Sequence, residues 1–141
     1  PTPAPDLIRL LLIISASKDW AVRQADVKTA YVHAPIDEEI YVEIPKGINL
    51  PRRNQVLRLN KALYGLKQAG FQWNQFLVKC LSQSGWIVSK YEPCLFKRNN
   101  GEYLLIYVDD MMVIAPSDAA ASAIVAELNS FFPVKDLGPL H

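Results

Sequence analysis

The sequence predicts a single α+β domain in which an antiparallel sheet carries helices packed on one of its faces. Short apolar runs bounded by turn residues indicate several strands, and closely spaced strands of this kind pair as hairpins. Two longer segments repeat their apolar residues with a helical period, which gives each of them one buried face. The length of 141 residues, half of them hydrophobic, suits one domain with a core of its own.

The N-terminal half predicts a helix followed by short strands. Pro5 suits the first turn of a helix, and Pro35 ends a later helical turn because proline disfavours helix in the residue before it. The expected elements are a helix over 5–18, a strand over 21–27, a helical turn over 28–33, and strands over 40–44 and 56–59 that pair across the loop 45–54.

The C-terminal half contains the two periodic helices and a run of strands. The expected elements are a helix over 68–84, strands over 95–98, 103–108 and 111–115, and a helix over 119–132. The first helix is expected to bury Trp73, Phe76, Leu77, Cys80 and Leu81, and the second Ile124, Val125, Leu128 and Phe132. Gly85 ends the first helix, Ser117 or Asp118 caps the second, and Asn99-Asn100-Gly101 indicates a hairpin turn.

The most informative stretch is Tyr107-Val108-Asp109-Asp110, where two adjacent acids stand between two apolar runs. Aspartate is favoured in tight turns, so an ordinary solvated turn is the simpler interpretation of this pair taken alone. Two negative charges at one turn repel, however, and Mg²⁺ binds one or two carboxylates together with substrate phosphates. Asp26, near the end of its strand, could complete a site for two ions about 3.5–4 Å apart.

Six blocks occur in order along the chain and carry a resemblance to a known family. They are Asp26 to Tyr31 (DVKTAY), Glu39 to Gly47 (EIYVEIPKG), Leu63 to Gln68 (LYGLKQ), Glu92 to Phe96 (EPCLF), Tyr107 to Asp110 (YVDD) and Asp136 to Gly138 (DLG). Together they resemble the reverse transcriptase of Ty1/copia-type long-terminal-repeat retrotransposons, over nearly the whole chain. The resemblance implies the palm of an RNA-directed DNA polymerase, which transfers a nucleotide from a dNTP to a primer 3′-hydroxyl.

The resemblance also implies roles for individual residues. Asp26, Asp109 and Asp110 match the family's three catalytic acids, which hold two Mg²⁺ or Mn²⁺ ions, and Val27 matches a residue whose carbonyl touches a metal. Tyr31 matches the aromatic residue that lies under the nucleotide sugar and excludes a 2′-hydroxyl. The segment that lines the nucleotide pocket is matched by Tyr64, Gly65, Lys67 and Gln68. Two departures, Ala34-Pro35 in place of a usual glycine and Gly70 where proline is common, touch no predicted metal ligand.

Partners and location follow from the same resemblance. It implies an RNA or DNA template with a primer, dNTPs, and the remaining Pol domains. Most of the fingers would precede residue 1, and the thumb, connection and ribonuclease H would follow residue 141. An intracellular protein is expected, in a cytoplasmic virus-like particle or the nucleus. The sequence contains no run of 18 apolar residues, so no membrane-spanning helix is expected.

Composition limits the alternatives. A net charge of +1 gives no general attraction to nucleic acid, although basic residues gather between positions 52 and 67. They are Arg52, Arg53, Arg58, Lys61 and Lys67, and a solvated basic face explains them equally well. Cys80 and Cys94 form neither a zinc set nor a disulfide framework and are interpreted as small buried apolar residues, which suits a reducing compartment.

Two other functions compete with the polymerase. One is a catalytically silent fragment of a retroelement, kept for a binding or structural role. The other is a metal-binding α+β domain with nuclease or cyclase chemistry, against which the nucleotide-pocket block around Tyr64-Gly65 argues.

Overall fold

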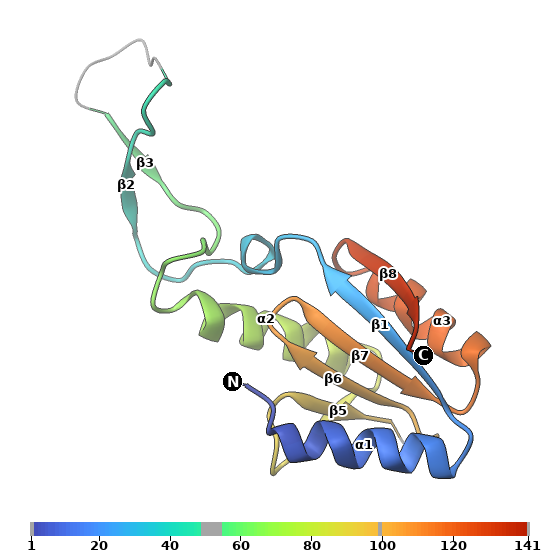
Figure 1. The fold of residues 1–141 in the computed structure, drawn as a ribbon. Coiled ribbons are helices and arrows are strands. Elements are labelled where there is room, and N and C mark those ends of the chain that lie inside the picture. The colour runs from blue at the N-terminus through green and yellow to red at the C-terminus, as the bar shows by residue number, and fades with distance from the viewer. Residues whose placement is uncertain (1, 49–54, 99, 141) are drawn as a thin grey trace.

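A six-stranded antiparallel sheet forms the centre of the computed structural model, which describes residues 2–48, 55–98 and 100–140 (Figure 1). The strand order is β4-β5-β6-β7-β1-β8, and every neighbouring pair runs antiparallel. The strands are β1 (Ala21–Val27), β4 (Ile87–Val88), β5 (Leu95–Lys97), β6 (Tyr103–Tyr107), β7 (Asp110–Ala115) and β8 (Val134–Pro139). The predicted α+β class with an antiparallel sheet is confirmed.

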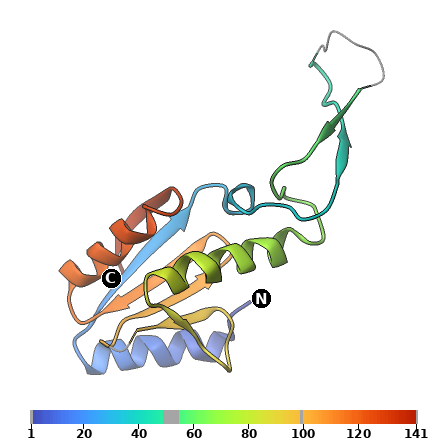
Figure 2. The ribbon, with the colours of Figure 1, turned by 180° about the vertical axis from the view of Figure 1, so that it is seen from behind.

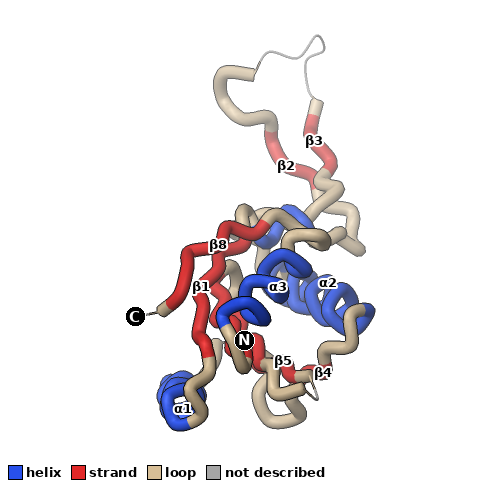
Figure 3. Tube along the Cα trace, turned by 90° about the vertical axis from the view of Figure 1, so that its right-hand side faces the viewer, coloured by secondary structure: helices blue, strands red, loops and turns tan. Residues whose placement is uncertain are grey.

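Helices cover both faces of this sheet. They are α1 (Pro5–Ser17), α2 (Ala69–Gln83) and α3 (Asp118–Leu128). Figure 3 shows α2 and α3 on one side of the strands and α1 on the other. The expectation of helices on one face is therefore correct for α2 and α3 and wrong for α1. The physical reason lies in β6, where Leu104 and Ile106 are buried toward α2 and α3 while Leu105 is buried toward α1.

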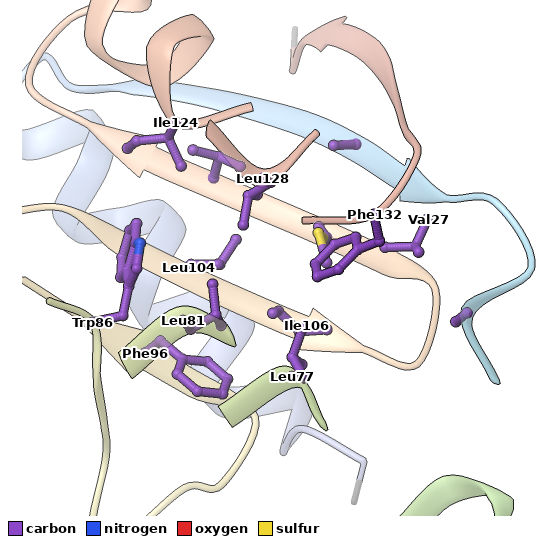
Figure 4. Packing of buried hydrophobic residues seen from close by; sticks show 14 of the residues in the cluster. Val27, Leu77, Leu81, Trp86, Phe96, Leu104, Ile106, Ile124, Leu128 and Phe132 are labelled. Carbon is purple, nitrogen blue, oxygen red and sulfur yellow. The ribbon is translucent and has the colours of Figure 1, made fainter. Parts of the chain in front are cut away.

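The larger core lies between the sheet and the pair α2 and α3 (Figure 4). All four apolar residues predicted for α3 and its continuation are buried, and the Ser117 hydroxyl caps this helix by accepting from the Ala120 N–H at 3.2 Å. In α2, Trp73, Leu77 and Leu81 are buried as predicted, whereas Phe76 and Cys80 are only half-buried. The smaller core under α1 is made by Leu11, Cys94, Leu105 and Ile114.

The remaining elements agree with the sequence in kind more than in extent. A 3₁₀ helix, η1 (Ala30–His33), follows β1, and strands β2 (Tyr41–Glu43) and β3 (Val56–Arg58) pair with each other as predicted. This hairpin is a separate two-stranded sheet that projects away from the main sheet (Figures 1 and 2). Parts of two predicted loops (residues 49–54 and Asn99), with Arg52 and Arg53 of the predicted basic cluster, lie outside the described residues.

Two strands were not predicted, β4 and β8. The β8 sequence is charged and contains Gly138 and Pro139, which are depleted in strands, so its pattern did not indicate one. Its position at the sheet edge explains how it tolerates them, and an ion pair helps to hold it. The Arg23 guanidinium on β1 contacts the Asp136 carboxylate at 2.9 Å and also pairs with Asp118 at the start of α3.

Both cysteines are free thiols. Burial raises the pKa of the Cys94 thiol to about 11, with the nearby Glu92 carboxylate acting in the same direction. Burial also raises the pKa of Cys80, although this side chain is half-buried where the sequence predicted full burial. In the described part of the chain, no helix is both long and apolar enough to cross a membrane.

The end of α2 generates a stability prediction. Gly85 follows this helix with φ +80°, and a β carbon there would meet no atom within 4 Å, so only the left-handed backbone disfavours other residues. We expect Gly85→Ala to lower the free energy of unfolding by about 1–2 kcal/mol. The matched control is Gly70→Ala in the first turn of α2, which should raise it by about 0.4–1 kcal/mol. Urea unfolding of both variants measures this, and changes of the same sign would contradict it.

Candidate active site

Two of the predicted acids lie directly opposite each other on neighbouring strands. Asp26, near the end of β1, is the cross-strand partner of Asp110, the first residue of β7. Directly opposite residues of an antiparallel pair share one face of the sheet, with β carbons about 4.5–5.5 Å apart. The fold therefore places the Asp26 and Asp110 side chains next to each other, although most of the chain separates them in sequence.

This acidic pair lies on the sheet face opposite α2 and α3. Their neighbours Ala25, Val27 and Met111 are buried in the core beneath those two helices. Successive side chains of a strand point to opposite faces, so Asp26 and Asp110 point away from this core. Asp26 is half-buried and Asp110 is exposed, which leaves both carboxylates open to a ligand from solvent.

The third predicted acid, Asp109, lies in the two-residue turn that joins β6 to β7. Its neighbour Val108 has φ +57°, a left-handed conformation that is strained for a β-branched residue and costs about 1–3 kcal/mol. Two hydrogen bonds hold the turn. The Val27 N–H donates to the Asp109 carbonyl at 2.8 Å, and the Trp73 indole N–H of α2 donates to the Val108 carbonyl at 2.8 Å.

The three carboxylates do not close into one metal-binding group. Within residues 2–48, 55–98 and 100–140, no three or more histidine, cysteine or acidic side chains are arranged to hold an ion. Convergence of Asp26, Asp109 and Asp110 within one metal shell therefore stays a prediction. The donor set itself suits Mg²⁺ or Mn²⁺, because carboxylate oxygens are hard ligands and a cation is what would draw three like charges together.

Two aromatic residues predicted for the nucleotide pocket, Tyr31 and Tyr64, contact each other near the acids. The ring centroids of Tyr31, in η1, and Tyr64 lie 4.4 Å apart with a tilt of 44°. Burial raises the pKa of Tyr64, the negative charge of Asp109 raises it further, and Tyr31 and Asp26 add smaller effects in the same direction. A backbone hydrogen bond with Ala30 acts against these. Tyr64 therefore lies close enough to the acids to respond to their charge.

The other predicted pocket residues lie just before α2 and are less clearly gathered. Gly65 has φ +96° with open space where a β carbon would stand, and Lys67 is exposed. The Gln68 amide donates to the Glu38 carboxylate at 3.2 Å. A cavity of about 200 Å³ connects Tyr31 to the turn of the acids, and its lining includes Tyr31, Gly70, Trp73, Tyr107 and Val108.

The roles of two residues in this region were not predicted from the sequence. Lys135 on β8 is the cross-strand partner of Asp26 on the side away from Asp110, which puts an exposed cation beside the acidic pair. Its strand was missed, so its position could not be inferred. Trp73 was predicted to be buried, and a buried indole N–H usually finds an acceptor, but the pattern alone does not say which one.

Comparison with known proteins gives one consistent family. The family model described as "Reverse transcriptase (RNA-dependent DNA polymerase)" matches residues 1–141. A Retrovirus-related Pol polyprotein from transposon TNT 1-94 of Nicotiana tabacum is 39% identical over 94% of this chain and 10% of its own length. The Pol polyprotein from transposon RE1 of Arabidopsis thaliana is 34% identical over 95% of this chain and 9% of its own.

A third relative is shorter. A transposon Ty5-1 protein of Saccharomyces cerevisiae is 36% identical over 80% of this chain and 38% of its own length. The chain thus spans about a tenth of the two plant polyproteins that it matches. No solved structure matches it.

The charge around Tyr64 generates a testable prediction. Replacing Asp109 by asparagine removes a negative charge that disfavours the phenolate, so we expect the pKa of Tyr64 to fall toward its ordinary value. Titration of ¹³C-labelled tyrosine by NMR, with Tyr64→Phe to assign the signal, measures the shift. The matched control is Asp6→Asn, an exposed acid on α1, which should leave the titration unchanged. An unchanged pKa of Tyr64 in Asp109→Asn would contradict the proximity of Tyr64 to Asp109.

Proposed function

Because the chain belongs to the reverse transcriptase family found in Pol polyproteins of Ty1/copia-type retrotransposons, we propose that it is the palm of an RNA-directed DNA polymerase. The single observation that carries the proposal is the placement of Asp26 directly opposite Asp110, with Asp109 in the adjoining turn. Oxygen ligands on neighbouring backbone segments and open to solvent are what two-metal nucleotidyl transfer requires.

The proposed role of the acids is to hold ions and substrate phosphates in register. Asp26, Asp109 and Asp110, with the Val27 carbonyl, would hold two Mg²⁺ or Mn²⁺ ions. When bound, the ions supply activation of the primer 3′-hydroxyl and neutralisation of the triphosphate and its leaving group. The carboxylates then act as ligands and need not accept a proton. Lys135 beside Asp26 offsets part of the repulsion among three like charges.

The proposed role of the Tyr31 and Tyr64 pair is to select the sugar of the incoming dNTP. The Tyr31 ring packs against the Tyr64 ring, and the absence of a side chain at Gly70 leaves room for the Tyr31 hydroxyl, which lies 3.8 Å from the place where a β carbon would stand. A ring held in this way excludes a 2′-hydroxyl by steric conflict, which selects against the ribonucleotide.

Binding of template and primer would depend on the rest of Pol. The chain covers about a tenth of the plant polyproteins, and its net charge of +1 provides no general attraction to a polyanion. We propose that the fingers, thumb and ribonuclease H provide the missing phosphate contacts, and that the enzyme works in a cytoplasmic virus-like particle or the nucleus.

The proposal is tested by Asp109→Asn in this chain and in the full-length Pol parent. We expect Mn²⁺ affinity and primer extension to fall by about 100-fold or more, since changes to outer-shell partners of a metal alone cost about 10–100-fold. Mn²⁺ binding is measured by electron paramagnetic resonance, and extension on an RNA template. Asp6→Asn is the matched control and should change neither.

Several outcomes of this experiment are informative. Unchanged Mn²⁺ binding and extension in Asp109→Asn would contradict the catalytic proposal and favour the silent fragment. The isolated chain should extend a primer weakly or not at all, because most of the rate comes from positioning primer, template and triphosphate together. Processive synthesis by the isolated chain would contradict the need for the other Pol domains.

Sugar selection has its own test. In the full-length parent, Tyr31→Ala should relax discrimination against ribonucleotides by about 10- to 100-fold, the range that exclusion of one small group provides. Mn²⁺ binding should stay unchanged, because Tyr31 is not among the proposed ligands. Single-nucleotide incorporation of each dNTP and its ribonucleotide measures the ratio. Tyr91→Ala, at a side chain that is 97% exposed, is the control, and equal discrimination in Tyr31→Ala would remove the assignment.

A further inference from the structure

The turn that carries Asp109 cannot hold its shape by local preference alone. Val108 occupies the left-handed region at φ +57°, where a β-branched side chain is disfavoured. A conformation of this kind persists only when the surrounding structure imposes it. Two hydrogen bonds reach the backbone of the turn, one from the Val27 N–H of β1 and one from the Trp73 indole of α2.

The indole has a fixed position of its own, independent of the turn. Trp73 is 3% exposed and belongs to the core between the sheet and the two helices. Its ring meets Phe132 edge to face at a centroid distance of 5.3 Å and lies 6.0 Å from Phe76. Because these aromatic contacts fix the ring, they also fix the place to which its N–H points.

We propose that Trp73 is a positioning residue for the acids, an inference that rests on the function proposed above. Its indole N–H is a donor only, and it holds the Val108 carbonyl at 2.8 Å. The direction of that carbonyl sets the plane of the peptide that joins Val108 to Asp109. Trp73 thus stabilises the strained turn and keeps Asp109 and Asp110 in place opposite Asp26.

The same tryptophan borders a cavity that lies beside the turn and is also lined by Tyr31. Trp73, Tyr31 and Val108 all line the cavity of about 200 Å³ beside the turn. One rigid side chain of α2 therefore contacts the turn of the acids and borders the space next to the Tyr31 ring. In this arrangement the packing of α2 determines the geometry of the acids without contributing a ligand.

The matched pair Trp73→Phe and Trp86→Phe separates the hydrogen bond from aromatic packing. Both tryptophans are buried in the same core, but the Trp86 indole points to the Glu127 carboxylate at 3.4 Å. We expect Trp73→Phe to weaken Mn²⁺ binding by about 10–100-fold, as for other outer-shell partners of a metal site. Trp86→Phe should leave it unchanged. Amide hydrogen exchange at Val27, whose N–H bonds to the turn, should accelerate in Trp73→Phe only.

Val108→Gly supplies the rescue. Glycine adopts the left-handed conformation without strain, so the turn no longer needs the indole to hold it. Adding Trp73→Phe to Val108→Gly should then cost much less Mn²⁺ affinity than Trp73→Phe alone, a coupling that independent sites do not show. If Trp73→Phe fails to fold, benzothienylalanine at position 73 takes its place, because it keeps the shape of the ring and lacks only the N–H that donates to the Val108 carbonyl. Faster Val27 exchange is expected with this residue, and an unchanged rate would overturn the proposal.

Failure of this proposal is distinguishable from failure of the proposed function. Equal costs of Trp73→Phe in the two backgrounds, or an unchanged rate of Val27 exchange, would overturn the positioning role and leave the acids' role intact. If Asp109→Asn leaves Mn²⁺ binding unchanged, the proposed function fails instead. In that case two measurements still decide whether Trp73 holds the turn. One is the rate of amide exchange at Val27, and the other is the coupling between Trp73→Phe and Val108→Gly in the free energy of unfolding.

Discussion

The register in which β1 pairs with β7 is the constraint on which the rest of the structure depends. In this register Ala25 and Val27 face the core beneath α2 and α3, and Asp26 meets Asp110 on the opposite face. A slip of one residue would invert every side chain of β1, exposing its apolar set and forcing Asp26 into an apolar core. Burying an unpaired carboxylate there is very unfavourable, so packing of the core and placement of the acids enforce each other.

The same register shapes the surroundings of the acids. Because β1 is an interior strand, it has Asp110 of β7 on one side and Lys135 of β8 on the other. The Val27 N–H, just past this acidic pair, bonds to the turn between β6 and β7, and the buried Trp73 bonds to that turn from the helix side. The backbone that carries these acidic side chains is thus hydrogen-bonded both within the sheet, through Val27, and from helix α2, through Trp73.

The sequence predicted what depends on short-range pattern and missed what depends on the assembled sheet. The strand over 21–27 and the buried face of α3 follow from apolar spacing, and the structure has both. Placing α1 on the opposite face required knowing that β6 is covered on both sides. The apolar run of β6 does not show this, because such a run is equally compatible with other buried elements. Lys135 was missed because Gly138 and Pro139 hid its strand. The partner of the Trp73 indole depends on a tertiary contact that no spacing encodes.

The position of β1 between β7 and β8 has a consequence for the order of folding. This strand comes first among the described strands, yet its two partners, β7 and β8, come last. During synthesis from the N-terminus, β1 therefore remains without a sheet neighbour until β7 has been made. Closing so long a loop is entropically costly and slow, which makes docking of β1 a late event. Asp26 meets Asp110 only at that step, so the metal site proposed above does not exist in a chain whose β1 is undocked.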